Sequence, residues 1–287
     1  MNRKGKKTKS WQGGDTLRRL FRSKSAIFGM TLIFLMIMLA VCANFFPYSP
    51  TASSPKEAKQ TSSWAHLCGT DELGRDILTR IAYGARISLT VGILAISISA
   101  LLGTILGSIA GFYGGRVDNY IMRFVDIWMA IPNLLLNISV VAALGNGLTN
   151  VIWAIGLSGT PNFCRIIRGS VLSSKSQEYV ESARASGASD LFVILYHIIP
   201  NCIAPMIVQC TLGIGNAILT CSSLSFLGIG VIPPTPEWGA MLSTGRSFIR
   251  NYPHMTFFPG LAMLITILGM NLLGDGLRDA LDPKLKN

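Results

Sequence analysis

Residues 174–205 read SKSQEYVESARASGASDLFVILYHIIPNCIAP and lie between two long apolar segments. Ser174, followed three residues later by Gln177, has the form of a capping box, so we expect a helix to begin there. Gly187 can take the left-handed conformation that ends a helix, and Ser189 can cap a second one. The stretch therefore predicts a polar helix–turn–helix.

This stretch is much longer than a simple connection between two membrane spans, which needs only a few residues. Pro200 is expected to close the second helix or to bend it into the next span. The length and the separate caps favour an element that docks on a partner. A hairpin that rests on lipid head groups is the alternative.

The composition is that of a membrane protein. Half of the 287 residues are hydrophobic, 14% are charged and the mean hydropathy is +0.46, whereas soluble domains carry about 25% charged residues. The net charge of +11 comes from basic residues before Ala26 and at the ends of apolar runs. That distribution sets membrane orientation and offers no continuous face for nucleic acid. We therefore expect lipid, and no nucleic acid, around this chain.

Six apolar runs are each long enough to cross a hydrocarbon core of ~30 Å as a helix. Gly145–Gly147 separates the third run from the fourth. The runs are 26–46, 87–112, the two halves of 127–164, 204–229 and 257–274. Basic residues flank the first run, the hairpin and the end of the chain, which places both termini in the cytoplasm. The sequence predicts an all-α membrane protein with six transmembrane helices.

The predicted organisation follows from these runs. Its segments are a basic cytoplasmic segment (1–25), the first span (26–46), an external loop with an interfacial helix (47–86), a core of five spans (87–280) that contains the cytoplasmic loop 174–203, and a cytoplasmic tail (281–287). In the external parts, Thr70 and Thr235 are the expected helix caps. Asp76 and Arg80 have the i,i+4 spacing of an ion pair.

Small and polar residues mark two of the spans. Gly103, Gly107 and Gly111 recur every four residues, a stripe that allows close packing of membrane helices. The run 204–229 is the most polar, and polar side chains inside a bilayer face the bundle interior or a water-filled path. We expect it to line a translocation pathway, with hydrogen bonds between helices as the alternative. The pathway candidates are Gln209, Asn216, Thr220 and Ser223.

The sequence lacks the residues that several kinds of chemistry require. The sequence contains no phosphate-binding loop, so ATP hydrolysis would need a separate polypeptide. Neither the three histidines nor the six cysteines have metal-ligand or disulfide spacing. Gly156–Gly159 matches the GxSG of intramembrane serine proteases, but no histidine base accompanies Ser158. The apolar interiors hold no charged residue, which disfavours an ion-coupled secondary transporter, the remaining alternative.

The hairpin also carries a family resemblance. Glu181, Ala183 and Gly187, followed by Pro200, resemble the EAA loop of ABC-importer membrane subunits. Three further strings resemble the dipeptide, oligopeptide and nickel branch, in its C-type subunit. They are GTDELGRD, SFLGIGVIPPTPEWGAML and NLLGDGLRDALDPKLK.

The resemblance implies a type I ABC-importer permease, which is not an enzyme, in the cell membrane. In that family the loop is a coupling helix that enters a groove on a cytoplasmic ATPase. The matching positions here are Glu178, Tyr179, Glu181, Ala183, Arg184, Gly187, Ala188 and Pro200. The implied partners are a homologous second permease in a heterodimer, two ATPases that bind ATP and Mg, and an external binding protein. This chain itself would bind no cofactor. Its cargo would be di- or oligopeptides, with nickel or a metal chelate as the alternative.

Overall fold

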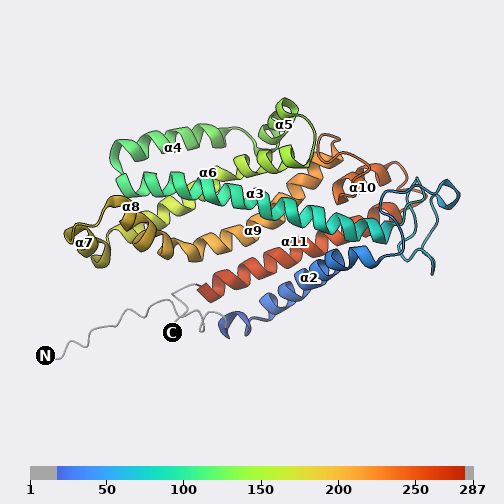
Figure 1. Ribbon diagram of the computed structural model, residues 1–287, viewed down its shortest axis with the longest axis horizontal. Helices are drawn as coiled ribbons and strands as arrows, with labels where there is room; N and C mark the ends of the chain where they lie inside the picture. Colours follow the sequence, from blue (N-terminus) through green and yellow to red (C-terminus); the bar gives the residue numbers. More distant parts are fainter. Residues whose placement is uncertain (1–17, 282–287) are drawn as a thin grey trace.

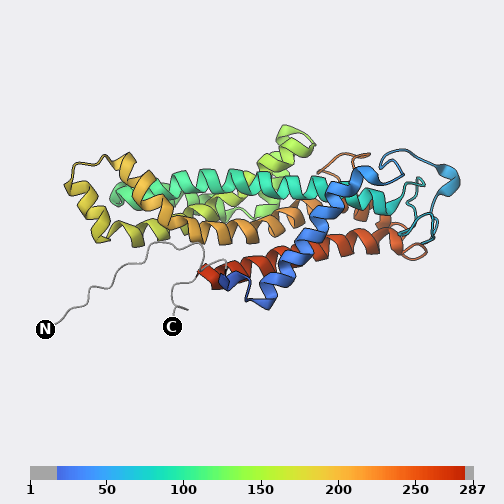
Figure 2. The ribbon, with the colours of Figure 1, turned by 60° about the horizontal axis from the view of Figure 1, so that its bottom comes forward.

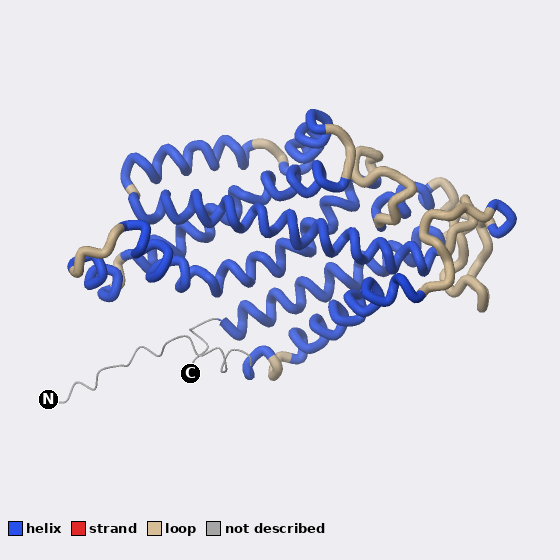
Figure 3. The backbone as a smooth tube through the Cα atoms, viewed as in Figure 1, coloured by secondary structure: helices blue, strands red, loops and turns tan. Residues whose placement is uncertain are grey.

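The computed structural model describes residues 18–281 and places most of them in helices (Figure 3). Within that range there is no β-strand, and one isolated bridge pairs Thr70 with Asp76. The prediction of an all-α protein is therefore confirmed. Most of the predicted basic segment 1–25 and nearly all of the predicted tail 281–287 lie outside the described residues.

The helices form an elongated bundle (Figures 1 and 2). In chain order they are α2 (Lys24–Val41), η1 (Cys42–Phe45), η2 (Pro55–Glu57), α3 (Ile77–Tyr113), α4 (Gly115–Ala130), α5 (Asn133–Leu144), α6 (Leu148–Lys175), α7 (Glu178–Ala185), α8 (Asp190–Phe192), the π-helical segment η3 (Val193–Ile198), α9 (Ile199–Phe226), α10 (Trp238–Arg246) and α11 (His254–Leu281). The long helices α3, α6, α9 and α11 lie along the bundle, and α2 crosses α11 obliquely. Helices α7 and α8 form one end, and α10 lies at the opposite end.

Helices α3 and α6 pack closely through the predicted glycine stripe. A Cβ atom built on Gly103 would lie 2.3 Å from the Cβ of Phe163, and one on Gly107 would lie 2.5 Å from the carbonyl oxygen of Cys164. The hydroxyl of Ser99 donates to the carbonyl of Gly156 at 2.7 Å, which joins the same two helices. The stripe is therefore a packing surface, as predicted.

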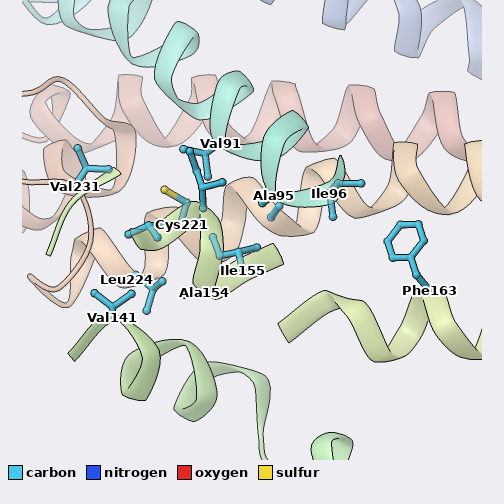
Figure 4. Packing of buried hydrophobic residues seen from close by; sticks show 13 residues of the cluster. Val91, Ala95, Ile96, Val141, Ala154, Ile155, Phe163, Cys221, Leu224 and Val231 are labelled. Atoms are coloured by element: carbon cyan, nitrogen blue, oxygen red, sulfur yellow. The ribbon is translucent and has the colours of Figure 1, made fainter. Parts of the chain in front are cut away.

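The largest hydrophobic cluster lies where α3, α5, α6 and α9 meet (Figure 4). Its fully buried members include Val91 of α3, Val141 of α5, Ala154 of α6 and Leu224 of α9. Because each helix contributes a buried face, the bundle is held by side-chain packing along its centre.

Four helical stretches of the described range are long and apolar enough to cross a membrane: Lys24–Phe45, Ile77–Tyr113, Asp190–Phe226 and His254–Leu281. The pair α4–α5, bent by 87°, would make a fifth crossing if it counts as one span. Helix α6 has the length but carries two arginines and several polar residues, and it falls outside this set. The structure thus supports a polytopic helical protein with four or five such crossings.

The predicted cap at Thr70 is wrong. Helix α3 begins at Ile77, and the carboxylate of Asp76 caps it by accepting the backbone N–H of Thr79 at 2.7 Å. Gly74 has a φ of +76°, a left-handed conformation that no helix running on from Thr70 could contain. The expected external helix and the second span are therefore one helix of 37 residues.

The predicted pair of Asp76 with Arg80 is also wrong. Asp76 is the N-cap of α3 and so lies just before its first helical residue. One of its carboxylate oxygens lies 3.0 Å from Nδ1 of His66. The guanidinium of Arg80 instead lies 3.5 Å from Asp71 and donates to the carbonyl of Pro50 at 2.7 Å. These buried contacts fix the loop that precedes α3 against the start of that helix.

The cap of α10 is Glu237, so the prediction of Thr235 is wrong. The carboxylate of Glu237 is fully buried and accepts the N–H of Ala240 at 2.9 Å and the hydroxyl of Ser222 at 2.8 Å. Its longer side chain reaches both groups, and α10 begins only at Trp238. Glu237 thereby fixes α10 to the end of α9.

Candidate functional site

The polar hairpin, residues 176–192, contains α7, a tight turn and α8. Gly187 has a φ of +84°, its N–H donates to the carbonyl of Arg184 at 2.9 Å, and the N–H of Ala188 donates to that of Ala183 at 3.1 Å. This pair of bonds is a Schellman motif, which requires the left-handed residue that the sequence predicted at Gly187. The hydroxyl of Ser189 caps α8 by accepting the N–H of Phe192, also as predicted.

The start of the hairpin differs from the prediction. Ser174 lies in the last turn of α6, which continues to Lys175, and α7 begins at Glu178. Gln177 is the cap residue but makes no capping bond with its side chain. The capping box at Ser174 and Gln177 is therefore wrong, because α6 continues through the residue that was expected to cap the next helix.

One face of α7 anchors the hairpin to the bundle. Val180 is 1% exposed and packs in a cluster with Phe112 of α3, Ile167 of α6 and Ile198 of η3. The guanidinium of Arg184 lies over the ring of Phe112, 4.4 Å from its centroid. The hairpin is thus held against α3, α6 and η3.

The other face of α7 makes few contacts with the bundle; one is the hydroxyl of Tyr179, which accepts a hydrogen bond from the amide of Asn201. Glu178, Tyr179, Glu181 and Gly187 are exposed, and nothing lies within 4 Å of the position of a Cβ atom on Gly187. Ala183 and Ala188 are half-buried against the cluster around Val180. The predicted coupling residues therefore divide between an anchored side and an exposed side.

Pro200 does not close the second helix, so that part of the prediction is wrong, and a bend at this point stays a prediction. It lies in the first turn of α9, and the chain continues from α8 through the π-helical segment Val193–Ile198 without a loop. Proline cannot donate to the carbonyl four residues earlier, and the wider π turn moves the hydrogen bonding to a spacing of five, as in the bond from Ile199 to Ile194. The sequence did not predict this segment.

A cavity of about 320 Å³ lies near the middle of α3, α6 and α9 and is called here the central cavity. Its lining combines apolar with amide and hydroxyl side chains: Ile96, Asn133, Asn137, Ile155, Ser158, Gly159, Asn162, Phe163, Gln209, Gly213, Asn216, Ala217, Leu219 and Thr220. No charged side chain is among them in the described part of the chain. The cavity therefore offers neutral hydrogen-bonding groups at the mid-depth of the bundle.

Three of the four pathway candidates line the central cavity, namely Gln209, Asn216 and Thr220. Ser223 lines a separate, mostly apolar cavity of about 270 Å³ near α10. The sequence analysis missed Asn133 and Asn137 of α5, although their i,i+4 spacing in an apolar run places them on one helix face.

Charged side chains lie away from this cavity. Arg168 of α6 forms a bidentate ion pair with Asp118 of α4, with N···O distances of 2.5 and 2.6 Å. Arg165 forms a second ion pair with Asp126, with an N···O distance of 2.5 Å. The hydroxyl of Ser158 donates to a carbonyl of its own helix, and no histidine contacts it within residues 18–281. The structure thus shows no protease-like arrangement around Ser158 in the described range.

Comparisons with known proteins agree with this architecture. Residues 103–287 match the family described as the binding-protein-dependent transport system inner membrane component. Residues 12–62 match the N-terminal TM domain of oligopeptide transport permease C. The inward-facing MetNI methionine ABC transporter is similar in fold, with a TM-score of 0.59 at 14% identity over 71% of this chain and 96% of that one.

Curated relatives extend over almost the whole chain. The dipeptide transport system permease protein DppC of Alkalihalophilus pseudofirmus is 45% identical over 95% of this chain and 90% of that protein. The glutathione transport system permease protein GsiD of Pectobacterium atrosepticum is 44% identical over 94% and 90%. With the apolar helices described above, these matches make the protein a multi-pass protein of the cell membrane. The chain belongs to the inner-membrane components of binding-protein-dependent ABC transport systems, and among them to the dipeptide and oligopeptide permeases.

Proposed function

We propose that this chain is one of two homologous permease subunits in an ATP-driven importer of di- and oligopeptides. The observation that carries the proposal is the polar hairpin, which exposes an acidic helix face while Val180 anchors it to the bundle. Such a face suits a partner that pushes on the bundle from one end. The relatives are named for dipeptide and glutathione transport, and glutathione is itself a tripeptide.

The proposed topology has six spans with both termini in the cytoplasm, beside the polar hairpin. Ala26 near the start of α2 packs with Ala280 at the end of α11, so the two ends of the described chain lie together. Arg165 and Arg168 lie toward the end of α6 that leads into the hairpin. Basic residues on that side agree with a cytoplasmic location. The fourth crossing in this proposal is α6, within the permease core 87–280.

The proposed coupling site is the hairpin together with the first turn of α9. Its residues are Glu178, Tyr179, Glu181, Ala183, Arg184, Gly187, Ala188 and Pro200. The amide of Asn201 donates to the hydroxyl of Tyr179 at 3.0 Å, which connects α7 directly to α9. A displacement of α7 would therefore reach the helix that lines the central cavity.

The proposed partners supply what this chain lacks. Two cytoplasmic ATPases would bind ATP and Mg and dock on the hairpin. An external protein would deliver the cargo to the opposite end of the bundle, near α10. Closure of the ATPases would tilt the spans and turn the central cavity from the inner to the outer side, as alternating access requires.

Reconstitution of the complete transporter tests this function. We expect liposomes that contain both permeases and the ATPases to take up a labelled tripeptide only when ATP and the external binding protein are supplied. Liposomes without ATP are the control. Uptake that depends on an ion gradient instead of ATP would contradict the proposal, and uptake of nickel chelates without peptides would support the alternative cargo.

Cysteine labelling in intact cells tests the topology. A cysteine that replaces Ser176 should be shielded from an impermeant maleimide, whereas one that replaces Trp64, 98% exposed in the external loop, should react. The native Cys68 should react only slowly with the maleimide and give a low background signal. Burial raises the pKa of its thiol to about 11, and the charge of Asp76 adds to this rise. At pH 7.5, below that pKa, its reactive thiolate is scarce. The reverse labelling pattern would disprove the proposed orientation.

A further inference from the structure

The central cavity is lined by several carboxamide side chains. Five of its lining residues are asparagine or glutamine, and they come from α5, α6 and α9: Asn133, Asn137, Asn162, Gln209 and Asn216. Three separate helices therefore bring the same functional group to one place. A carboxamide offers both a hydrogen-bond donor and an acceptor without a charge.

Asn137 is the most telling of these residues. Its side chain is 1% exposed, and neither its Oδ1 nor its Nδ2 has a hydrogen-bond partner in the described part of the chain. Leaving both groups of a buried amide unsatisfied costs stability, and most buried polar atoms in proteins are paired. A residue kept at such a cost suggests a ligand that completes its hydrogen bonds.

The other carboxamides are available too. Within residues 18–281, Asn133, Asn162, Gln209 and Asn216 make no side-chain hydrogen bond to the protein. Asn162 and Asn216 are exposed in the single chain, at a depth where an amide facing lipid would be costly. They must therefore face a watery path or the second subunit.

The hydroxyls of the cavity serve a different purpose. The hydroxyl of Ser158 donates to the carbonyl of Ile155 at 3.1 Å, and that of Thr220 donates to the carbonyl of Asn216 at 2.8 Å. Both donors are thus used inside their own helices. The donors that remain for a ligand are the amide N–H groups of the five carboxamides.

We propose that the central cavity is a transient binding site for the main-chain amides of a passing peptide. A peptide unit carries one N–H donor and one C=O acceptor. The oxygen of a carboxamide can accept from the first, and its NH₂ group can donate to the second. Recognition of this kind ignores the side chains of the cargo, and an uncharged lining has no counter-ion that would hold a charged terminus. The volume of about 320 Å³ lies at the lower end of the ~300–1,000 Å³ of small-ligand sites, enough for a short segment. The inference rests on the proposed peptide-import function.

The first test uses Asn137→Leu, which is close to isosteric. Removing an unsatisfied buried amide should leave the thermal midpoint of the purified transporter unchanged or higher. Uptake of trialanine by the reconstituted transporter should fall at least tenfold, while ATP hydrolysis stimulated by the loaded binding protein persists. Ser139→Ala is the matched control, because this exposed hydroxyl of α5 bonds only within its helix and lies outside the cavity.

A lower thermal midpoint with a proportional loss of uptake and hydrolysis would overturn the inference, since it would make Asn137 a structural residue. Unchanged uptake would overturn it as well. In either case wild-type uptake of trialanine would still establish the peptide-import function. If the wild-type transporter moved no peptide at all, the proposed function and the inference would fail together.

The second test asks whether the amide itself is recognised. Alanyl-lactyl-alanine has an ester oxygen in place of one peptide N–H of trialanine, and both probes are used at concentrations that saturate the binding protein. We expect the wild type to move trialanine about fivefold faster, as the loss of one hydrogen bond implies. The double variant Asn162→Ala/Asn216→Ala should bring this ratio close to one. A ratio that stays at the wild-type value in the double variant would refute amide recognition, because the binding protein is the same in both measurements.

Discussion

Replacing Gly103 by alanine is expected to prevent α3 and α6 from packing, and with it the folding of the bundle. The added Cβ would lie 2.3 Å from the Cβ of Phe163 and 2.9 Å from the backbone nitrogen of Cys164. Neither atom belongs to the end of a flexible side chain, so the helices would have to move apart along their whole contact. Overpacking of this kind costs about 3 kcal/mol at the upper end of its usual range.

The measurement is the yield of monodisperse protein in detergent and its thermal midpoint. Gly169→Ala is the matched control, because Gly169 lies on α6 and has nothing within 4 Å of the position of a Cβ atom. It should behave as the wild type or slightly better, since alanine favours a helix more than glycine does. Equal yields for the two variants would show that the stripe is not the packing surface described here.

The second large effect is expected at Gly187, where a leucine should abolish transport and leave the bundle folded. A Cβ atom there would have nothing of this chain within 4 Å, so we expect the added side chain to disturb chiefly a partner that docks on the hairpin. The φ of +84° adds a backbone cost of about 1–2 kcal/mol for a residue with a side chain. We expect at least a tenfold loss of ATP-dependent uptake and weaker co-purification of the ATPases.

Gly228 provides a closely matched control for this backbone cost. Its φ is +83°, and it too has nothing within 4 Å of a Cβ position, but it follows α9 at the opposite end of the bundle. Gly228→Leu should retain the ATPases as the wild type does. If both variants lost the ATPases equally, or if Gly187→Leu kept wild-type uptake and co-purification, the coupling role of the hairpin would be refuted.

The sequence predicted best those features that depend on neighbouring residues or on a single helix face. The glycine stripe of Gly103 and Gly107 was identified as a packing surface because its spacing matches one side of a helix. The turn at Gly187 and the cap at Ser189 were identified because few residue types suit those conformations.

Helix starts were predicted poorly, because several residues near each start can act as caps. Thr70 and Asp76 are both suitable, and Thr235 competes with Glu237. The choice depended on distant partners, such as the hydroxyl of Ser222 that bonds the carboxylate of Glu237. Such partners are set by the tertiary fold and do not appear in the local sequence.

Only some of the residues that line the central cavity were singled out from the sequence, because the lining comes from several helices that the fold brings together. The polar run of α9 was visible as a series of polar residues in one span, and Gln209 and Asn216 do line the cavity. Asn137 and Asn162 lie in other helices, and only the packing of α5 and α6 against α9 brings them to the same place. Ser223, from the same run, faces a different cavity because it lies one turn further along α9.

The unbroken path from α8 through the π-helical segment into α9 has a mechanical meaning. A helical rod is stiff, whereas a loop would absorb a push by bending. Gln209 is ten residues beyond Ile199, so roughly 15 Å of rod at 1.5 Å per residue separates the start of α9 from the cavity wall. If a partner docks on the hairpin as proposed, its displacement would therefore reach the cavity wall through helix alone, with no loop between them to absorb it.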